Sequence, residues 1–203
     1  IRIIDYKSSV KNIDFNEVEY GIRLQLLTYL DAISTQKQVE PAGILYFNLI
    51  EPMIKVNQNM SEEMLEEEIR KKFKMNGLVL ADVKVVKMMD HTLETGRSNV
   101  IPAYIDKEGK VGTSGGNTVT KEEFSYLQKY TCKMIKQIAK QIYDGRIDLA
   151  PYYNLKNKQT PCTYCKYKTI CQFSPGFCHN SYQFIPNLEK KKALEEIKNR
   201  VEE

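Results

Sequence analysis

The first residues that could do chemistry are Asp5 and Lys7, which stand in the run Ile1-Arg2-Ile3-Ile4-Asp5-Tyr6-Lys7. Three isoleucines among the first four residues predict a buried β-strand. Because successive side chains of a strand point to opposite faces, Asp5 and Lys7 would project from the same side. Asp5 could then hold Mg²⁺, while Lys7 orients a water molecule or neutralises a phosphate. A simple ion pair at the end of a strand would give the same pattern.

The next candidates, Gln25 and Tyr29, lie four residues apart in a helix predicted from about Val18 to Ser34. The spacing places them on one face, and the apolar residues expected on that face are Ile22, Leu26 and Ile33. A glutamine on a buried stripe needs hydrogen-bond partners. Either the backbone or a polar active site could supply them.

A strand ending in Asp5-Tyr6-Lys7-Ser8-Ser9, followed by a helix with Gln25-Leu26-Leu27-Thr28-Tyr29, resembles the RecB-like branch of the PD-(D/E)xK nucleases. The resemblance implies a Mg²⁺-dependent deoxyribonuclease, of exonuclease type, that hydrolyses phosphodiester bonds. It also implies roles for the matching residues. Asp5 would be a metal ligand and Lys7 the catalytic lysine. Gln25 and Tyr29 would shape the site and contact DNA.

The family's other acidic residue stands on a preceding strand, for which this sequence offers no position. Glu17 and Glu19 lie on the wrong side of the motif to replace it. We therefore expect the parent protein to be a nuclease and this stretch alone, as an N-terminally truncated part, to be inactive or nearly so.

Cys162, Cys165 and Cys171 form a C-x2-C-x5-C pattern, which suits a metal ion or cluster. Five cysteines, four of them crowded together, make a poor disulfide framework and favour an intracellular site. Zinc is the metal usually bound by a bare C-x2-C, and free cysteines without a metal are the alternative. The triplet resembles that of RecB-like nucleases with a 4Fe–4S cluster. In that family the fourth cysteine lies far upstream, which here would place it outside the chain.

Three further potential ligands are left without a role. Cys178 and His179 follow the triplet, but the resemblance does not assign them. Cys132 falls near the apolar stripe of a predicted helix, so we expect it in the core.

Tyrosines and lysines alternate around the triplet, an arrangement that could follow a DNA strand by phosphate contact and base stacking. Lysines in solvent around a packed tyrosine cluster would look the same. The residues expected to bind DNA are Lys166, Tyr167 and Lys168, and their neighbours in the pattern are Tyr152, Tyr153, Lys156, Lys158 and Tyr164.

The bulk composition is that of an ordinary globular protein and decides little. The 203 residues carry a net charge of +4, which is compatible with nucleic-acid binding without arguing for it. No apolar run approaches about 20 residues, so no membrane span is expected. The cysteine usage predicts a cytoplasmic location.

The elements that must position these residues indicate an α/β fold. The resemblance implies a restriction-endonuclease-like core with a largely helical insert. The expected segments are a strand–helix–strand core (1–50), an insert (51–119), a core helix and strand (120–151), an iron–sulfur segment (152–180) and a terminal helix (181–203). The expected strands are 1–7, 44–50 and 100–105, and further helices start at Ser61, Thr120 and Asn187.

About 130 residues separate Tyr29 from Cys162. In this long spacing the sequence resembles the AddAB-type helicase–nucleases more than the compact CRISPR-adaptation members of the family. That resemblance implies cleavage of single-stranded DNA beside an AddA-like helicase partner during double-strand-break repair and recombination. Two other hypotheses stay open. One is a non-catalytic DNA-binding module, and the other is a zinc-stabilised interaction domain.

Overall fold

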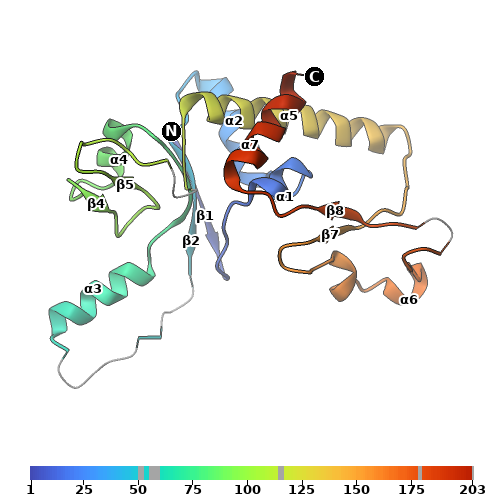
Figure 1. Cartoon of the computed structure of the whole chain (residues 1–203), viewed down its shortest axis with the longest axis horizontal. Coiled ribbons are helices and arrows are strands. Elements are labelled where there is room, and N and C mark those ends of the chain that lie inside the picture. The colour runs from blue at the N-terminus through green and yellow to red at the C-terminus, as the bar shows by residue number, and fades with distance from the viewer. Residues whose placement is uncertain (50–52, 55–59, 114–116, 178–179, 203) are drawn as a thin grey trace.

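The structure, a computed structural model, describes residues 1–49, 53–54, 60–113, 117–177 and 180–202. Its helices are α1 (Phe15–Glu19), α2 (Gln25–Lys37), α3 (Glu62–Lys72), α4 (Val83–Met89), α5 (Lys121–Tyr143), the 3-10 helix η1 (Pro161–Tyr164), α6 (Lys168–Cys171) and α7 (Lys190–Glu202). Its strands are β1 (Arg2–Lys7), β2 (Gly43–Asn48), β3 (Asn76–Leu80), β4 (Gly96–Arg97), β5 (Tyr104–Ile105), β6 (Thr118–Val119), β7 (Tyr152–Asn154) and β8 (Gln183–Ile185). Helices and strands intermix along the chain (Figure 1), which confirms the predicted α/β class.

A central sheet with the order β1-β2-β3-β6 organises the part of the chain that the structure describes. β1 is parallel to β2, β2 is antiparallel to β3, and β3 is parallel to β6. β3 and β6 lie in the range expected to be a largely helical insert, so the sheet draws on that range as well. β3 approaches β2 so closely at Gly77, where φ is +140°, that a Cβ atom would lie 2.1 Å from the carbonyl oxygen of Ile44.

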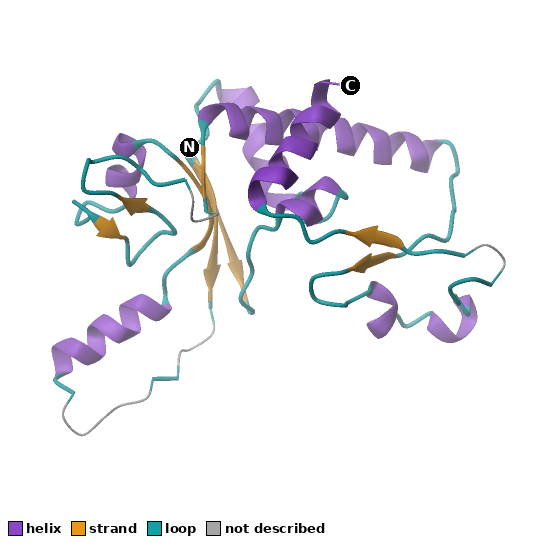
Figure 2. Ribbon diagram, in the orientation of Figure 1, coloured by secondary structure: helices purple, strands orange, loops and turns teal. Residues whose placement is uncertain are grey.

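Different elements lie on the two sides of the sheet (Figure 2), and each face has its own hydrophobic core. The strand alternation sends Ile44 and Tyr46 to the face covered by α1, α2, α5 and α7. Leu45 and Phe47 point to the other face, where α4 and the β4–β5 pair pack. Residues on the helical face of β1 are therefore the ones that can meet α2.

The chain between β1 and β2 forms two helices where the sequence predicted one from Val18 to Ser34. α1 begins after Asp14, whose carboxylate accepts a hydrogen bond from the Asn16 amide at 3.0 Å. Left-handed residues then turn the chain, with φ of 76° at Gly21 and 60° at Arg23. A non-glycine residue rarely adopts this conformation, so the sequence pattern did not reveal the break.

The insert range matches the prediction at its start and differs later. Ser61 caps α3 as expected, through a 3.3 Å bond from the Met64 amide. The helix ends at Lys72, short of the expected end near Gly77, because β3 begins at Asn76. The strand expected at 100–105 is reduced to β5.

The long helix α5 begins with the predicted capping box between Thr120 and Glu123. Its first half packs into the core through Leu127 and Tyr130. Its second half extends past the core in Figure 1, and Ile142 is 72% exposed. The predicted apolar stripe is thus buried over only half of its length. α7 confirms the predicted terminal helix and packs against α5.

Candidate active site

Asp5 and Lys7 lie on the helical face of β1, as the strand alternation predicted. The row Ile3–Ile44–Leu78 across β1, β2 and β3 is apolar, and two residues further along the strands comes the polar row Asp5–Tyr46–Asn76. The site therefore begins where the hydrophobic core ends. Lys7 Nζ and Asp5 Oδ2 form an ion pair at 2.6 Å.

The Asp5 carboxylate has an oxygen that could hold a metal ion. Oδ2 is buried and accepts no well-directed hydrogen bond from the described residues, so its contact with Lys7 is an ion pair. The described part of the chain contains no ready group of three or more His, Cys, Asp or Glu ligands. A single hard carboxylate still fits Mg²⁺, which commonly takes one or two carboxylates and completes its shell with water and phosphate.

Gln25 and Tyr29 connect helix α2 to Lys7. The Gln25 Oε1 atom accepts a hydrogen bond from Lys7 Nζ at 3.3 Å, and Gln25 Nε2 donates to the Tyr29 hydroxyl at 3.2 Å. The expectation that both stand on the buried stripe of the helix was wrong. Both are exposed, since the helix buries Leu26, Leu27, Leu30 and Ser34 instead. The polar face that carries the motif is the face that meets the end of β1.

The ion pair with Asp5 raises the pKa of Lys7, with a smaller opposing effect of burial. Lys7 is therefore an ammonium at neutral pH, which suits charge stabilisation rather than proton abstraction. Its Nζ atom also lies 6.0 Å from the ring centroid of Tyr46, the next residue of the polar row.

The structure places Glu17 and Arg23 near Tyr46 of the polar row, although the sequence gave neither residue a role. The Glu17 carboxylate pairs with Arg23 Nε through one oxygen, and its other oxygen accepts a 3.2 Å hydrogen bond from Asn154. Burial raises the pKa of Tyr46, and the charges of Glu17 and Arg23 act on its hydroxyl as well. The left-handed Arg23 and the buried Glu17 became identifiable only in three dimensions, because the pattern gave no sign of the turn.

Cys162, Cys165 and Cys171 line one small pocket of about 310 Å³. η1 begins after Thr160, whose hydroxyl accepts from the Cys162 amide at 3.4 Å, and α6 ends at Cys171. The thiols share a cavity, although in the described residues they do not form a ready metal-binding group. Cys178 and His179 lie outside the described residues.

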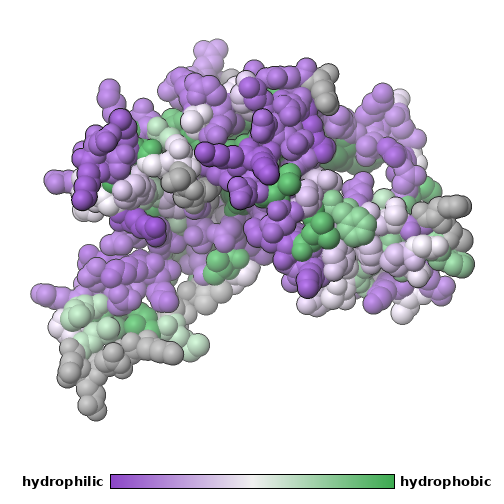
Figure 3. Space-filling model, in the orientation of Figure 1, coloured by the Kyte–Doolittle hydropathy of each residue, from purple (hydrophilic) through white to green (hydrophobic). Residues whose placement is uncertain are grey.

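The aromatic and basic residues around the cysteines divide into two groups. Tyr153 packs against Tyr182 and Phe184, with ring centroids 5.5 Å and 5.9 Å away. Lys156 is bound to Asp14 at 2.8 Å. The second group is exposed and consists of Tyr164, Lys166, Tyr167 and Lys168, with the two tyrosines 89% and 71% exposed. In Figure 3 this part of the molecule mixes hydrophilic and hydrophobic surface.

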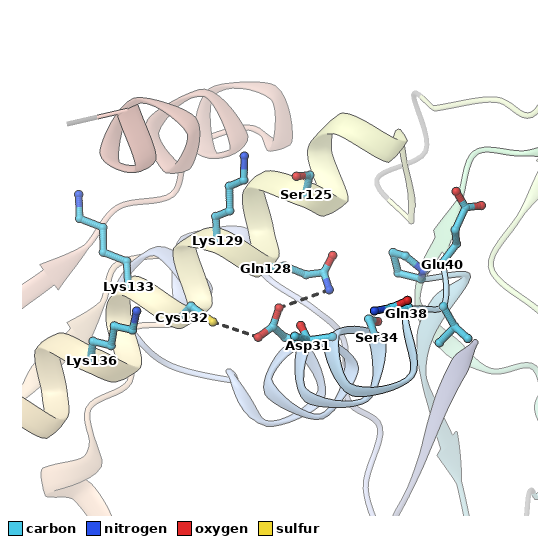
Figure 4. Close-up of a pocket in the computed structure, with 13 residues that line it drawn as sticks. Asp31, Ser34, Gln38, Glu40, Ser125, Gln128, Lys129, Cys132, Lys133 and Lys136 are labelled. Carbon is cyan, nitrogen blue, oxygen red and sulfur yellow. Dashed lines mark hydrogen bonds between the residues drawn. The ribbon is translucent and has the colours of Figure 1, made fainter.

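A larger cavity, of about 690 Å³, opens between α2 and α5 (Figure 4). Cys132 lines it and donates to Asp31 at 3.0 Å, so the expectation that this cysteine is a core residue was wrong. Gln128 reaches the same carboxylate at 3.5 Å. The other carboxylate of the cavity, Glu40, pairs with Lys121.

None of the helices in the described part of the chain combines the length and apolar character that a membrane crossing requires.

Residues 1–172 match the PD-(D/E)XK nuclease superfamily. One subunit of the ATP-dependent helicase/deoxyribonuclease of Bacillus subtilis (strain 168) is 44% identical over 204 residues, which cover 98% of this chain and 17% of that protein. The corresponding protein from Bacillus thuringiensis (strain Al Hakam) is 41% identical over 209 residues, which cover 99% of this chain and 18% of that protein. The chain thus spans less than a fifth of the length of these relatives. Since the matched range covers most of the sequence and contains both the β1 motif and the α2 motif, the chain belongs to the PD-(D/E)XK nuclease superfamily.

Proposed function

We propose that this chain carries the nuclease site of an ATP-dependent helicase/deoxyribonuclease that cuts single-stranded DNA during double-strand-break repair. The observation that supports this most is the connected set of Asp5, Lys7, Gln25 and Tyr29 at the end of the sheet. The relatives are subunits of an ATP-dependent helicase/deoxyribonuclease, which supports DNA as the substrate class. We also propose that the helicase partner is AddA-like.

The side chains divide the work between metal binding and charge stabilisation. Asp5 would be one protein ligand of a Mg²⁺ ion, and the ion would supply Lewis-acid stabilisation of the phosphate. The Lys7 ammonium stabilises the negative charge that develops on the phosphate oxygens, or orients the attacking water. Gln25 limits the freedom of Lys7, and Tyr29 holds Gln25.

We further propose that Cys162, Cys165 and Cys171 hold a 4Fe–4S cluster together with a fourth ligand. Thiolates are the ligands that such clusters prefer, and the shared pocket supports a common centre. The exposed Lys166, Tyr167 and Lys168 beside it are proposed to bind the DNA strand. An odd number of crowded cysteines, which is a poor disulfide framework, and a DNA substrate also support a cytoplasmic location.

The nuclease proposal is tested with Lys7→Ala in the full-length protein with its helicase partner. We expect cleavage of single-stranded DNA to fall by about 100-fold or more, while helicase activity stays. Lys37→Ala, in the last turn of α2, is the matched control. Unchanged cleavage in Lys7→Ala would remove this lysine from the mechanism and favour a non-catalytic DNA-binding module.

The cluster proposal is tested by metal analysis of anaerobically purified full-length protein. About four irons per chain, with broad visible absorption, would support the cluster. Cysteine-to-serine changes at 162, 165 and 171 should each lower the iron content. Iron-free protein with one zinc would instead favour a zinc-stabilised domain.

A further inference from the structure

A second polar pocket, of about 350 Å³, lies on the side of β3 away from β2. It is formed by the first residues of β3 and those just before them, by the β4–β5 pair, and by the residues that lead into β6. Its lining consists of Lys74, Asn76, Arg97, Pro102, Ala103, Tyr104, Gly112, Asn117 and Thr118.

The charged residues that the structure places in this pocket are all positive. Among the described residues, its charged lining residues are Lys74 and Arg97, and no carboxylate from this part of the chain lines it. Among the described residues neither cation forms an ion pair, whereas many other lysines and arginines of the chain do. Burial, and then the nearby Arg97, lower the pKa of Lys74. Two cations that lie together with no counter-ion among the described residues suit the binding of an external anion.

The other lining residues suit an oxyanion. Side-chain amides of Asn76 and Asn117 and the hydroxyl of Tyr104 offer polar groups around the cations. Asn117 is held in place by a 3.1 Å bond to the Gly77 carbonyl oxygen. The Tyr104 ring forms a wall over Gly112, where a Cβ atom would lie 2.8 Å from the ring. The pocket is therefore shaped by neighbouring elements rather than by flexible surface chains alone.

The pocket shares a sheet row with the nuclease site. Asn76, which lines it, is paired with Tyr46, and Tyr46 is paired with Asp5. Two strand spacings place the Asn76 backbone about 10 Å from that of Asp5. One strand of a duplex rises roughly 3.4 Å per nucleotide, so this separation corresponds to a few nucleotides at most.

From these observations we propose that Lys74 and Arg97 form a phosphate subsite that holds the backbone of the DNA strand a few nucleotides from the scissile bond. This inference rests on the proposed nuclease function and deepens it. The subsite contacts a part of the substrate that does not react, so it contributes to binding rather than to the chemical step.

The test uses the full-length protein with its helicase partner and a short single-stranded oligonucleotide. For Lys74→Ala combined with Arg97→Ala, we expect KM to rise about tenfold with kcat nearly unchanged. The slope of log KM against log salt concentration should fall by about 0.7, the value for one lost phosphate contact on a single strand. Lys74→Arg should retain most of the affinity, because it keeps the charge.

Lys87→Ala, on an exposed position of α4 outside the pocket, is the matched control. If KM and the salt slope of the double variant equal those of the wild type while Lys7→Ala is inactive, the subsite is refuted and the nuclease proposal stands. Cleavage that survives Lys7→Ala refutes the nuclease proposal instead. Competition with DNA by inorganic phosphate or a free mononucleotide, seen only in protein with an intact pocket, supports the subsite. Nucleotide binding that needs Lys74 and Arg97, with an unchanged KM for DNA, would overturn the assignment to the DNA strand.

Discussion

Gln25 offers the sharpest test of how the site is held together. It touches Lys7 through Oε1 at 3.3 Å and Tyr29 through Nε2 at 3.2 Å, and its side chain is exposed. Gln25→Ala should therefore leave the fold intact, with the free energy of unfolding within about 0.5 kcal/mol of the wild type. What it removes is the restraint that keeps the Lys7 ammonium in one position.

The size of the effect follows from the length and exposure of the bond. A hydrogen bond to a charged group contributes about 1.5–3 kcal/mol when well formed, and a long, solvent-accessible one lies nearer to about 1 kcal/mol. At about 1.4 kcal/mol per tenfold change in rate, kcat should fall about fivefold. Tyr29→Phe removes only the outer link to Gln25, so its effect should be smaller.

The assay is the metal-dependent cleavage of a short single-stranded oligonucleotide by the full-length protein, with kcat and KM measured separately. Gln36→Ala, an exposed glutamine on the same helix, is the control and should match the wild type. A kcat for Gln25→Ala within about twofold of the wild type, with Lys7→Ala inactive, would refute the idea that Gln25 positions the lysine. A large loss accompanied by lower stability would point to a structural role instead.

Three further changes test the fold that supports the site. Phe124→Ala empties a fully buried position and should lower the free energy of unfolding by about 3–5 kcal/mol, measured by denaturant titration. Gly77→Ala should cost about 3 kcal/mol, because its new Cβ meets the Ile44 carbonyl at a positive φ, and a wild-type midpoint of unfolding would contradict this close approach. Burial opposes the charged form of Asp90, but bonds from Ser98 and Thr92 outweigh it and lower the pKa of that carboxyl below its usual 3.8. The associated stability is present above pH 3.8 and is lost as the pH falls through the lowered value, so Asp90→Asn should flatten the acid limb of a stability–pH curve.

Local sequence patterns were enough to predict the features whose geometry depends only on residues close together in the sequence. The alternation of a strand places Asp5 and Lys7 on one face whatever surrounds them. The capping box at Thr120 likewise needs only residues within one turn. The spacing of Cys162, Cys165 and Cys171 predicts a shared site, and the three do line one pocket.

The same patterns failed where contacts between distant segments decide where a helix ends and which of its faces is buried. The sequence predicted a continuous helix through Gly21 and Arg23, because a left-handed arginine leaves no periodic signal. It also placed Gln25 on the buried face. The helix turns Leu26, Leu27 and Leu30 inward instead, and this leaves the motif free to meet Lys7.

The sequence by itself determined the family and the strand that carries Asp5 and Lys7, since both depend on residue type and short spacing. Only the tertiary structure decided which residues share the site. Pairing of β1, β2 and β3 aligns Asp5, Tyr46 and Asn76 in one row, although about 70 residues separate the first from the last. That register depends on the packing of both faces of the sheet, which no local pattern contains.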